Sequence, residues 1–209
     1  MSSAFWWYVT RSTGITAWAI CAGSVIFGLA LSTRALGKNP TAPWLLDLHR
    51  YLGGLSVVFV GVHLGSLVAD NYTHWGTADL FVPFATSWKS TAVAWGIVSF
   101  YLLLAIEITS LLKRHIPKRW WHRVHMTSFG LYVVSTIHLL TAGTDRLNRP
   151  LLYSVAASLG LVVFFTTMRT IAPKRRCRQT PRPAAPTNSP AQLRKTPSDS
   201  DRIAYASRA

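Results

Sequence analysis

Five long apolar runs alternate with polar segments through most of residues 1–172. The runs cover approximately residues 14–33, 51–70, 91–112, 126–143 and 151–168. Each is close to the roughly 20 residues that an α-helix needs to cross a bilayer core. None alternates strictly as a β-barrel strand does, and a helix satisfies its own backbone hydrogen bonds within lipid. The pattern predicts an all-α integral membrane bundle of about five transmembrane helices.

The first run has an alternative interpretation as a cleaved secretory signal, because Arg11 precedes it and small residues end it. The run is long for the apolar region of a signal, however. In addition, Arg34 and Lys38 follow it where a mature N-terminus would be expected. We therefore keep the first run as a transmembrane helix.

Charge then suggests an orientation. Only 14% of residues are charged, against roughly 25% in a typical soluble domain. The basic residues on one side of the predicted membrane are Arg34, Lys38, Arg50, Lys113, Arg114, Lys118, Arg119, Arg123, Arg169, Lys174, Arg175, Arg176 and Arg178. The other side has only Arg11, Lys89, Arg146 and Arg149. The positive-inside rule places the N-terminus outside and the C-terminus in the cytoplasm of a multi-pass plasma membrane protein.

The formal net charge of +15 is thus mainly a signal of topology and of contact with membrane lipid. Nucleic acid is not an expected partner, since no folded soluble domain remains to present a basic face. Residues 173–209 contain six of the eleven prolines and almost no apolar run. This composition predicts a basic, proline-rich disordered cytoplasmic tail after a transmembrane domain at 1–172. Cys21 and Cys177 are too far apart in this topology to form a disulfide.

Two of the apolar runs carry a pair of histidines. His49 and His63 are fourteen residues apart, and His125 and His138 are thirteen apart. Both runs cross in the same direction in the predicted topology, so His49 lies at the depth of His125, and His63 at the depth of His138. Fourteen helical residues span roughly 21 Å, which predicts two layers of paired imidazoles near opposite faces of the membrane.

The two histidine pairs differ in how far their side chains are rotated from each other about the helix axis. At about 100° per residue, His49 and His63 project only about 40° apart, which is one helix face. His125 and His138 project roughly 140° apart on an ideal helix. The second helix must therefore be tilted or distorted, or its ligands must approach from different sides.

Paired imidazoles at matched depth suit axial ligation of haem iron. His49, His63, His125 and His138 are the candidate metal ligands, for two haem b groups or for one. Glycines let a porphyrin approach the backbone, or simply let helices pack closely; the candidates are Gly53, Gly54, Gly61 and Gly65, with Gly130 near His125. Arg50 and Arg123 could pair with haem propionates or serve only as topology charges.

The other three histidines are weaker candidates for a functional role. His115 and His122 fall in the basic segment "KRHIPKRWWHRVH", where solvated or interfacial side chains are expected. His122 is nevertheless an alternative to His125, one turn away. His74 lies in the aromatic loop between the second and third runs and has no identifiable partner.

The histidine segments resemble the ferric reductase-like transmembrane domain superfamily. Its members include ferric reductases, NADPH oxidases and the haem-binding membrane subunit of the bacterial methionine sulfoxide reductase system. The resemblance covers about residues 12–170 and rests on "LHRYLGGLSVVFVGVHL" and "WHRVHMTSFGLYVVSTIHLL". It implies two stacked b-type haems, with the thirteen-residue spacing as part of the pattern. His49 and His125 would hold the cytoplasmic-side haem, and His63 and His138 the outer one.

The resemblance implies electron transfer across the membrane. The chain shows no glycine-rich dinucleotide fingerprint after a strand, so we expect no flavin or nicotinamide site in it. It is similar to stand-alone bacterial members, which receive electrons from a separate flavoprotein or quinol and pass them to an extracytoplasmic acceptor. Whether it is itself an oxidoreductase stays open.

A metal or proton transporter or channel without haem is the alternative function. The same histidines would then bind a transition metal or relay protons, with Glu107, the only glutamate, as their companion. Transport pathways often contain broken helices near the bilayer midplane, but no proline interrupts any of the five runs.

Overall fold

The structure, a computed structural model, describes residues 3–33, 40–70, 75–145 and 147–171. Seven α-helices form in these residues: α1 Ser3–Thr33, α2 Ala42–Ala69, α3 Thr77–Phe81, α4 Ser90–Leu111, α5 Lys118–Met126, α6 Ser128–Ala142 and α7 Arg149–Ile171. The predictions for His74 and for the tail at 173–209 lie outside the described residues.

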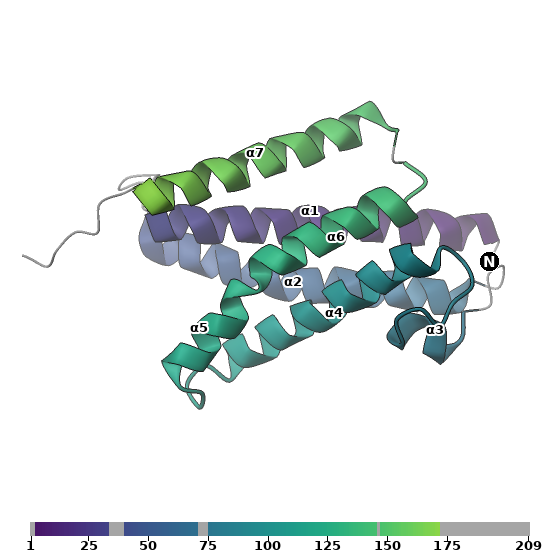
Figure 1. Cartoon of the computed structure of the whole chain (residues 1–209), viewed down its shortest axis with the longest axis horizontal. Helices are drawn as coiled ribbons and strands as arrows, with labels where there is room; N and C mark the ends of the chain where they lie inside the picture. The colour runs from purple at the N-terminus through teal and green to yellow at the C-terminus, as the bar shows by residue number, and fades with distance from the viewer. Residues whose placement is uncertain (1–2, 34–39, 71–74, 146, 172–209) are drawn as a thin grey trace, which may run out of the picture. The chain divides into compact units, whose positions relative to one another are not determined.

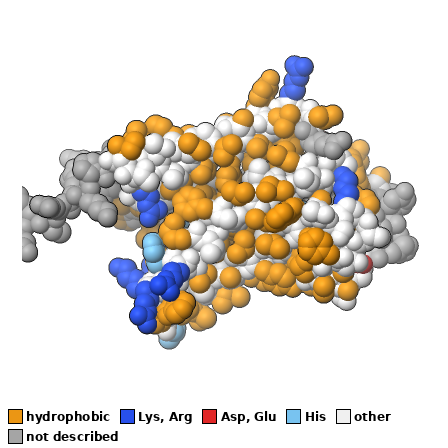
Figure 2. Space-filling model, in the orientation of Figure 1, with side chains coloured by type: hydrophobic (Ala, Val, Ile, Leu, Met, Phe, Trp, Pro, Cys, Tyr) orange, Lys and Arg blue, Asp and Glu red, His pale blue; other side chains and the backbone are white. Residues whose placement is uncertain are grey.

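Four of the described helices, α1, α2, α4 and α7, are long and apolar enough to cross a membrane. The predicted all-α membrane bundle is confirmed. The remaining apolar run, 126–143, forms the 15-residue α6, which is shorter than the roughly 20 residues of a typical span. Figure 2 shows apolar side chains along the helices and Lys and Arg gathered over α5.

Two prolines help to set helix starts. Pro43 lies in the first turn of α2, where its missing N–H costs nothing because the first turn has no intrahelical acceptor. α2 consequently begins nine residues before the predicted run at 51. Pro117 directly precedes α5, so the connection after α4 ends in a new helix and not in a loop.

The distortion expected between His125 and His138 occurs at Thr127. Both its hydroxyl and its backbone N–H donate to the carbonyl of Val124, at 2.7 and 3.0 Å. This i→i−3 bond tightens the turn and interrupts the regular α-helical pattern. His125 therefore ends α5, whereas His138 belongs to α6, and the 140° separation of an ideal helix does not apply.

Helix α1 is central to the bundle. It packs against α2, α6 and α7, while α4 packs against α6, α5 and α2 (Figure 1). The largest core cluster consists of Trp18, Ala22, Val25, Leu29 and Ala30 of α1 with Tyr132, Leu139, Leu151, Val162 and Phe165. Trp18 also donates its indole N–H to the hydroxyl of Thr136, at 3.0 Å. Because α2 and α6 run in the same direction (Figure 1), the two histidines of α2 can meet His125 at the end of α5 and His138 of α6 in two layers.

Candidate functional site

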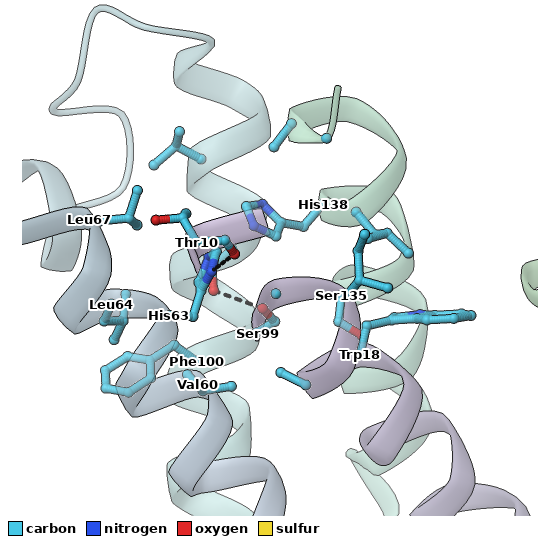
Figure 3. Close-up of a pocket in the computed structure, with 18 of the residues that line it drawn as sticks. Thr10, Trp18, Val60, His63, Leu64, Leu67, Ser99, Phe100, Ser135 and His138 are labelled. Atoms are coloured by element: carbon cyan, nitrogen blue, oxygen red, sulfur yellow. Dashed lines mark hydrogen bonds between the residues drawn. The ribbon is translucent and has the colours of Figure 1, made fainter. Parts of the chain in front are cut away.

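The four candidate histidines line two separate cavities. His49 and His125 line one of about 220 Å³, named here the His49–His125 cavity. His63 and His138 line the other, of about 300 Å³, named the His63–His138 cavity; Figure 3 shows both of its rings with Trp18 and Phe100. The structure thus brings together the same two pairs as the depth argument predicts.

The ring centres of His49 and His125 are 5.8 Å apart and their planes are 80° to each other. Two imidazole nitrogens bound to one metal ion at about 2 Å each would hold the ring centres roughly 6 Å apart. The separation of this pair therefore suits a single metal ion shared between two imidazoles.

Three of the four imidazoles are oriented by main-chain carbonyls. The Nδ1 atom of His49 bonds to the carbonyl of Ser24 at 2.9 Å, that of His63 to Thr10 at 2.9 Å, and that of His138 to Ala92 at 2.8 Å. A carbonyl can only accept, so each Nδ1 carries the hydrogen. In a neutral ring, Nε2 then keeps its lone pair and is available to bind a metal.

A glycine lies four residues after each accepting carbonyl. These are Gly14 after Thr10, Gly28 after Ser24, and Gly96 after Ala92. A Cβ at Gly14, Gly28 or Gly96 would approach Cε1 of the neighbouring histidine to 3.0, 3.1 or 2.6 Å respectively. A hydrogen at these positions therefore lets each ring lie against the helix backbone and reach its carbonyl.

Sequence reasoning missed these residues although α1 carries a signal for them. Thr10 and Gly14 in "TRSTG" are repeated fourteen positions later as Ser24 and Gly28 in "SVIFG". Fourteen is also the His49–His63 spacing on α2, the helix with which α1 has its most extensive contact. Equal spacings on two packed helices place the same contact at two depths.

His125 is held differently from the other three. Its Nδ1 is buried and has no hydrogen-bond partner among the described residues. Trp121 stacks on its ring, with centroids 5.0 Å apart and planes at 22°. On α5, outside the four candidate spans, burial lowers the pKa of His125 below its ordinary value, and His49, His122 and Lys113 lower it further. Burial thus favours the neutral form of the ring, which is the form that binds a metal.

The predicted glycines divide into two groups. Gly53 lines the His49–His125 cavity, where a Cβ would meet the Glu107 carboxylate at 2.5 Å. Gly54, Gly61 and Gly65 are exposed on α2, have open space around them and line neither cavity. Gly130 is likewise exposed. Helix rotation decides this difference, which proximity along the sequence cannot reveal.

The two predicted propionate partners also lie outside both cavities. Arg50 is exposed and is 3.7 Å from Asp47 one turn earlier. Arg123 lies over the ring of Trp120, at 5.1 Å from its centroid. Arg169 of α7 lines the His49–His125 cavity instead. The sequence did not point to Arg169, because α7 reaches this cavity only through tertiary packing.

Glu107 and His122 both line the His49–His125 cavity. His122 is exposed on the same helix as His125. Because it also lines this cavity, it remains the alternative ligand to His125. His115 is exposed in the turn after α4, as expected. Within the described ranges, no group of three or more His, Cys, Asp or Glu side chains is arranged so that it could hold a metal ion.

One layer of side chains separates the two cavities. Cys21, Ser56, Leu103 and Leu131, one from each of α1, α2, α4 and α6, line both of them. All four are buried, and Ser56 is only 1% exposed. Groups bound in the two cavities would thus be neighbours across a thin and largely apolar partition.

Polar and aromatic side chains surround the far end of the His63–His138 cavity. Arg11 of α1 forms an ion pair with Asp145, which follows α6, and both line the cavity. Trp75 and Trp88 line it from the connection around α3, with ring centroids 6.0 Å apart. Side chains of α1, of the α6–α7 connection and of the segment around α3 thus line this end of the cavity.

Comparisons with known proteins add no further information about the site. The chain matches no family model, no curated protein and no solved structure. The resemblance to the ferric reductase-like superfamily therefore stays a prediction based on the two histidine spacings. What the structure itself shows is an all-α membrane bundle that places four histidines as two pairs.

Proposed function

We propose that this protein is a transmembrane electron-transfer haem b protein. It would take electrons from a cytoplasmic flavoprotein or quinol and pass them to an extracytoplasmic acceptor. The single observation that carries the proposal is the pairing: His49 and His125 line one cavity, and His63 and His138 line the other. Three of these four rings also donate Nδ1–H to a carbonyl.

The residues fit a haem in each cavity. His49 and His125 would hold one group, and His63 and His138 the other, each through Nε2. A bound haem would supply one-electron chemistry at its iron. The backbone carbonyls of Thr10, Ser24 and Ala92 orient the rings and increase their basicity as ligands. The surrounding apolar side chains limit water and favour haem retention.

The arrangement of the two cavities supports a relay. They lie at different depths along α2, because His49 and His63 are fourteen residues apart. Only one layer of side chains separates them, formed by Cys21, Ser56, Leu103 and Leu131. Basic side chains gather around α5, near the His49–His125 cavity (Figure 2). By the positive-inside rule this would be the cytoplasmic end, and the proposed cytoplasmic donor would deliver electrons there.

Optical spectroscopy tests the proposal directly. Protein purified from haem-replete cells should show a b-type reduced-minus-oxidised spectrum with about two haems per chain, one for each bis-histidine pair. A preparation that retains a single haem would show that only one pair functions in this way. A colourless preparation that carries zinc or copper would overturn the proposal in favour of a transporter.

A further inference from the structure

The two histidine pairs differ in how firmly their rings are held. In the His63–His138 pair, both Nδ1 atoms bond to carbonyls, at 2.9 and 2.8 Å. In the His49–His125 pair, only His49 makes this bond, and among the described residues Nδ1 of His125 has no partner. Removing the outer partner of a ligating histidine typically costs about 10–100-fold in metal affinity. His125 should therefore be the weakest of the four ligands.

Helix α4 supplies no such carbonyl to His125. The residues of α4 that line the His49–His125 cavity are Leu103, Ile106 and Glu107, and Nδ1 of His125 bonds to none of them. The contact that orients His138 is thus not repeated at the depth of His125.

The backbone that carries His125 is also weakly held. Helix α5 has only nine residues, none of them buried, and the Thr127 turn separates it from α6. The other three histidines lie on α2 and α6, which both contribute buried residues. Few buried contacts and a short helix are the features of a segment that opens locally at low free-energy cost.

We propose that His125 is an exchangeable ligand, so that the His49–His125 centre, but not the His63–His138 centre, accepts an exogenous small ligand. This rests on the proposed function, because it requires a bound haem. With carbon monoxide as the probe, Nε2 of His125 would leave the iron and the carbon lone pair of the probe would take its place. No electron is transferred in this substitution, and the freed imidazole remains in its cavity.

Carbon monoxide titration of the reduced, haem-loaded protein tests this proposal. We expect the wild-type chain to bind about one carbon monoxide per two haems. His63→Ala, which retains the His49–His125 centre, should still bind it, whereas His49→Ala should not. The affinities of the two centres should differ by at least about tenfold. Binding at both haems, at neither, or only in His49→Ala would overturn the proposal.

A second pair of variants avoids the ligands themselves. Trp121 stacks on His125, so Trp121→Ala should free the ring and strengthen carbon monoxide binding several-fold. Trp120 is a matched control on the same helix, because it is 51% exposed and contacts Arg123 instead. Equal affinities in wild type and Trp121→Ala would contradict the proposal. A colourless wild-type preparation would overturn the proposed function itself, whereas a two-haem protein that binds no carbon monoxide would overturn only this inference.

Discussion

His63 of α2 donates its Nδ1 hydrogen to the carbonyl of Thr10 on α1, at 2.9 Å. Thr10 is fifty-three residues earlier in the chain, and no residue of α1 is a histidine. Helix α1 nevertheless decides which nitrogen of His63 is free, since a carbonyl oxygen only accepts hydrogen bonds. The same relationship joins His49 to Ser24. A helix without histidines thus orients both histidine rings of its neighbour.

Histidine pairing can be tested by single and double substitutions. His63→Ala and His138→Ala should each abolish the same haem signal and leave the other largely intact, because one iron needs both axial ligands. The double variant should resemble either single variant, since residues that act as one unit are strongly non-additive. Haem content and the reduced-minus-oxidised spectrum measure this. Loss of different haems in the two single variants would contradict the pairing.

His122→Ala should retain both haems if His125 is the ligand on α5. Both residues line the same cavity, but His122 is exposed, whereas the ring of His125 is 5.8 Å from that of His49. Haem stoichiometry of His122→Ala and His125→Ala compares the two. If His122→Ala loses a haem that His125→Ala keeps, the ligand assignment on α5 is wrong.

Gly96→Ala should selectively damage the His63–His138 centre. The added Cβ would lie 2.6 Å from Cε1 of His138, so the ring must move away from the carbonyl of Ala92. Such overpacking typically costs about 1–3 kcal/mol, and we expect loss of one haem. Gly65→Ala is the control, because its surroundings are open and alanine favours a helix by up to about 1 kcal/mol. Unchanged haem content in Gly96→Ala would show that the ring does not need this contact.

Asp145→Asn should lower thermal stability by weakening the ion pair with Arg11. The two side chains are 12% and 35% exposed, so the loss should fall between the about 0–1 kcal/mol of a surface pair and the 3–5 kcal/mol of a buried one. Unfolding in detergent measures the change. The exchange Arg11→Asp with Asp145→Arg should recover part of it, whereas additive losses in the double variant would show that the pair contributes little.

Membrane orientation is testable with reporters. A reporter fused after Ala209 should behave as cytoplasmic, and one inserted near Thr77 should be external, because Lys and Arg concentrate on the side that the C-terminus faces. The opposite result would exchange the electron-entry and electron-exit ends. It would leave the histidine pairs themselves unchanged.

The sequence alone determined the helical class and the depth of the histidines. Apolar runs near 20 residues imply helices in lipid, and a rise of 1.5 Å per residue converts sequence spacing directly into depth. His49 therefore had to lie level with His125 once α2 and the α5–α6 segment ran in the same direction. These conclusions need only the geometry of a single helix.

Tertiary structure alone decided which residues face the cavities. Gly54, Gly61 and Gly65 are close to histidines in sequence but turn away from them, whereas Gly14, Gly28 and Gly96 touch the rings from other helices. Arg169 likewise replaces Arg50 and Arg123 at the His49–His125 cavity. The physical reason is that side-chain packing between helices sets their rotation about their own axes, and a mostly apolar membrane helix has little polar asymmetry to reveal it. The depth of a residue depends only on its own helix, whereas the direction in which its side chain points depends on the packing of the whole bundle.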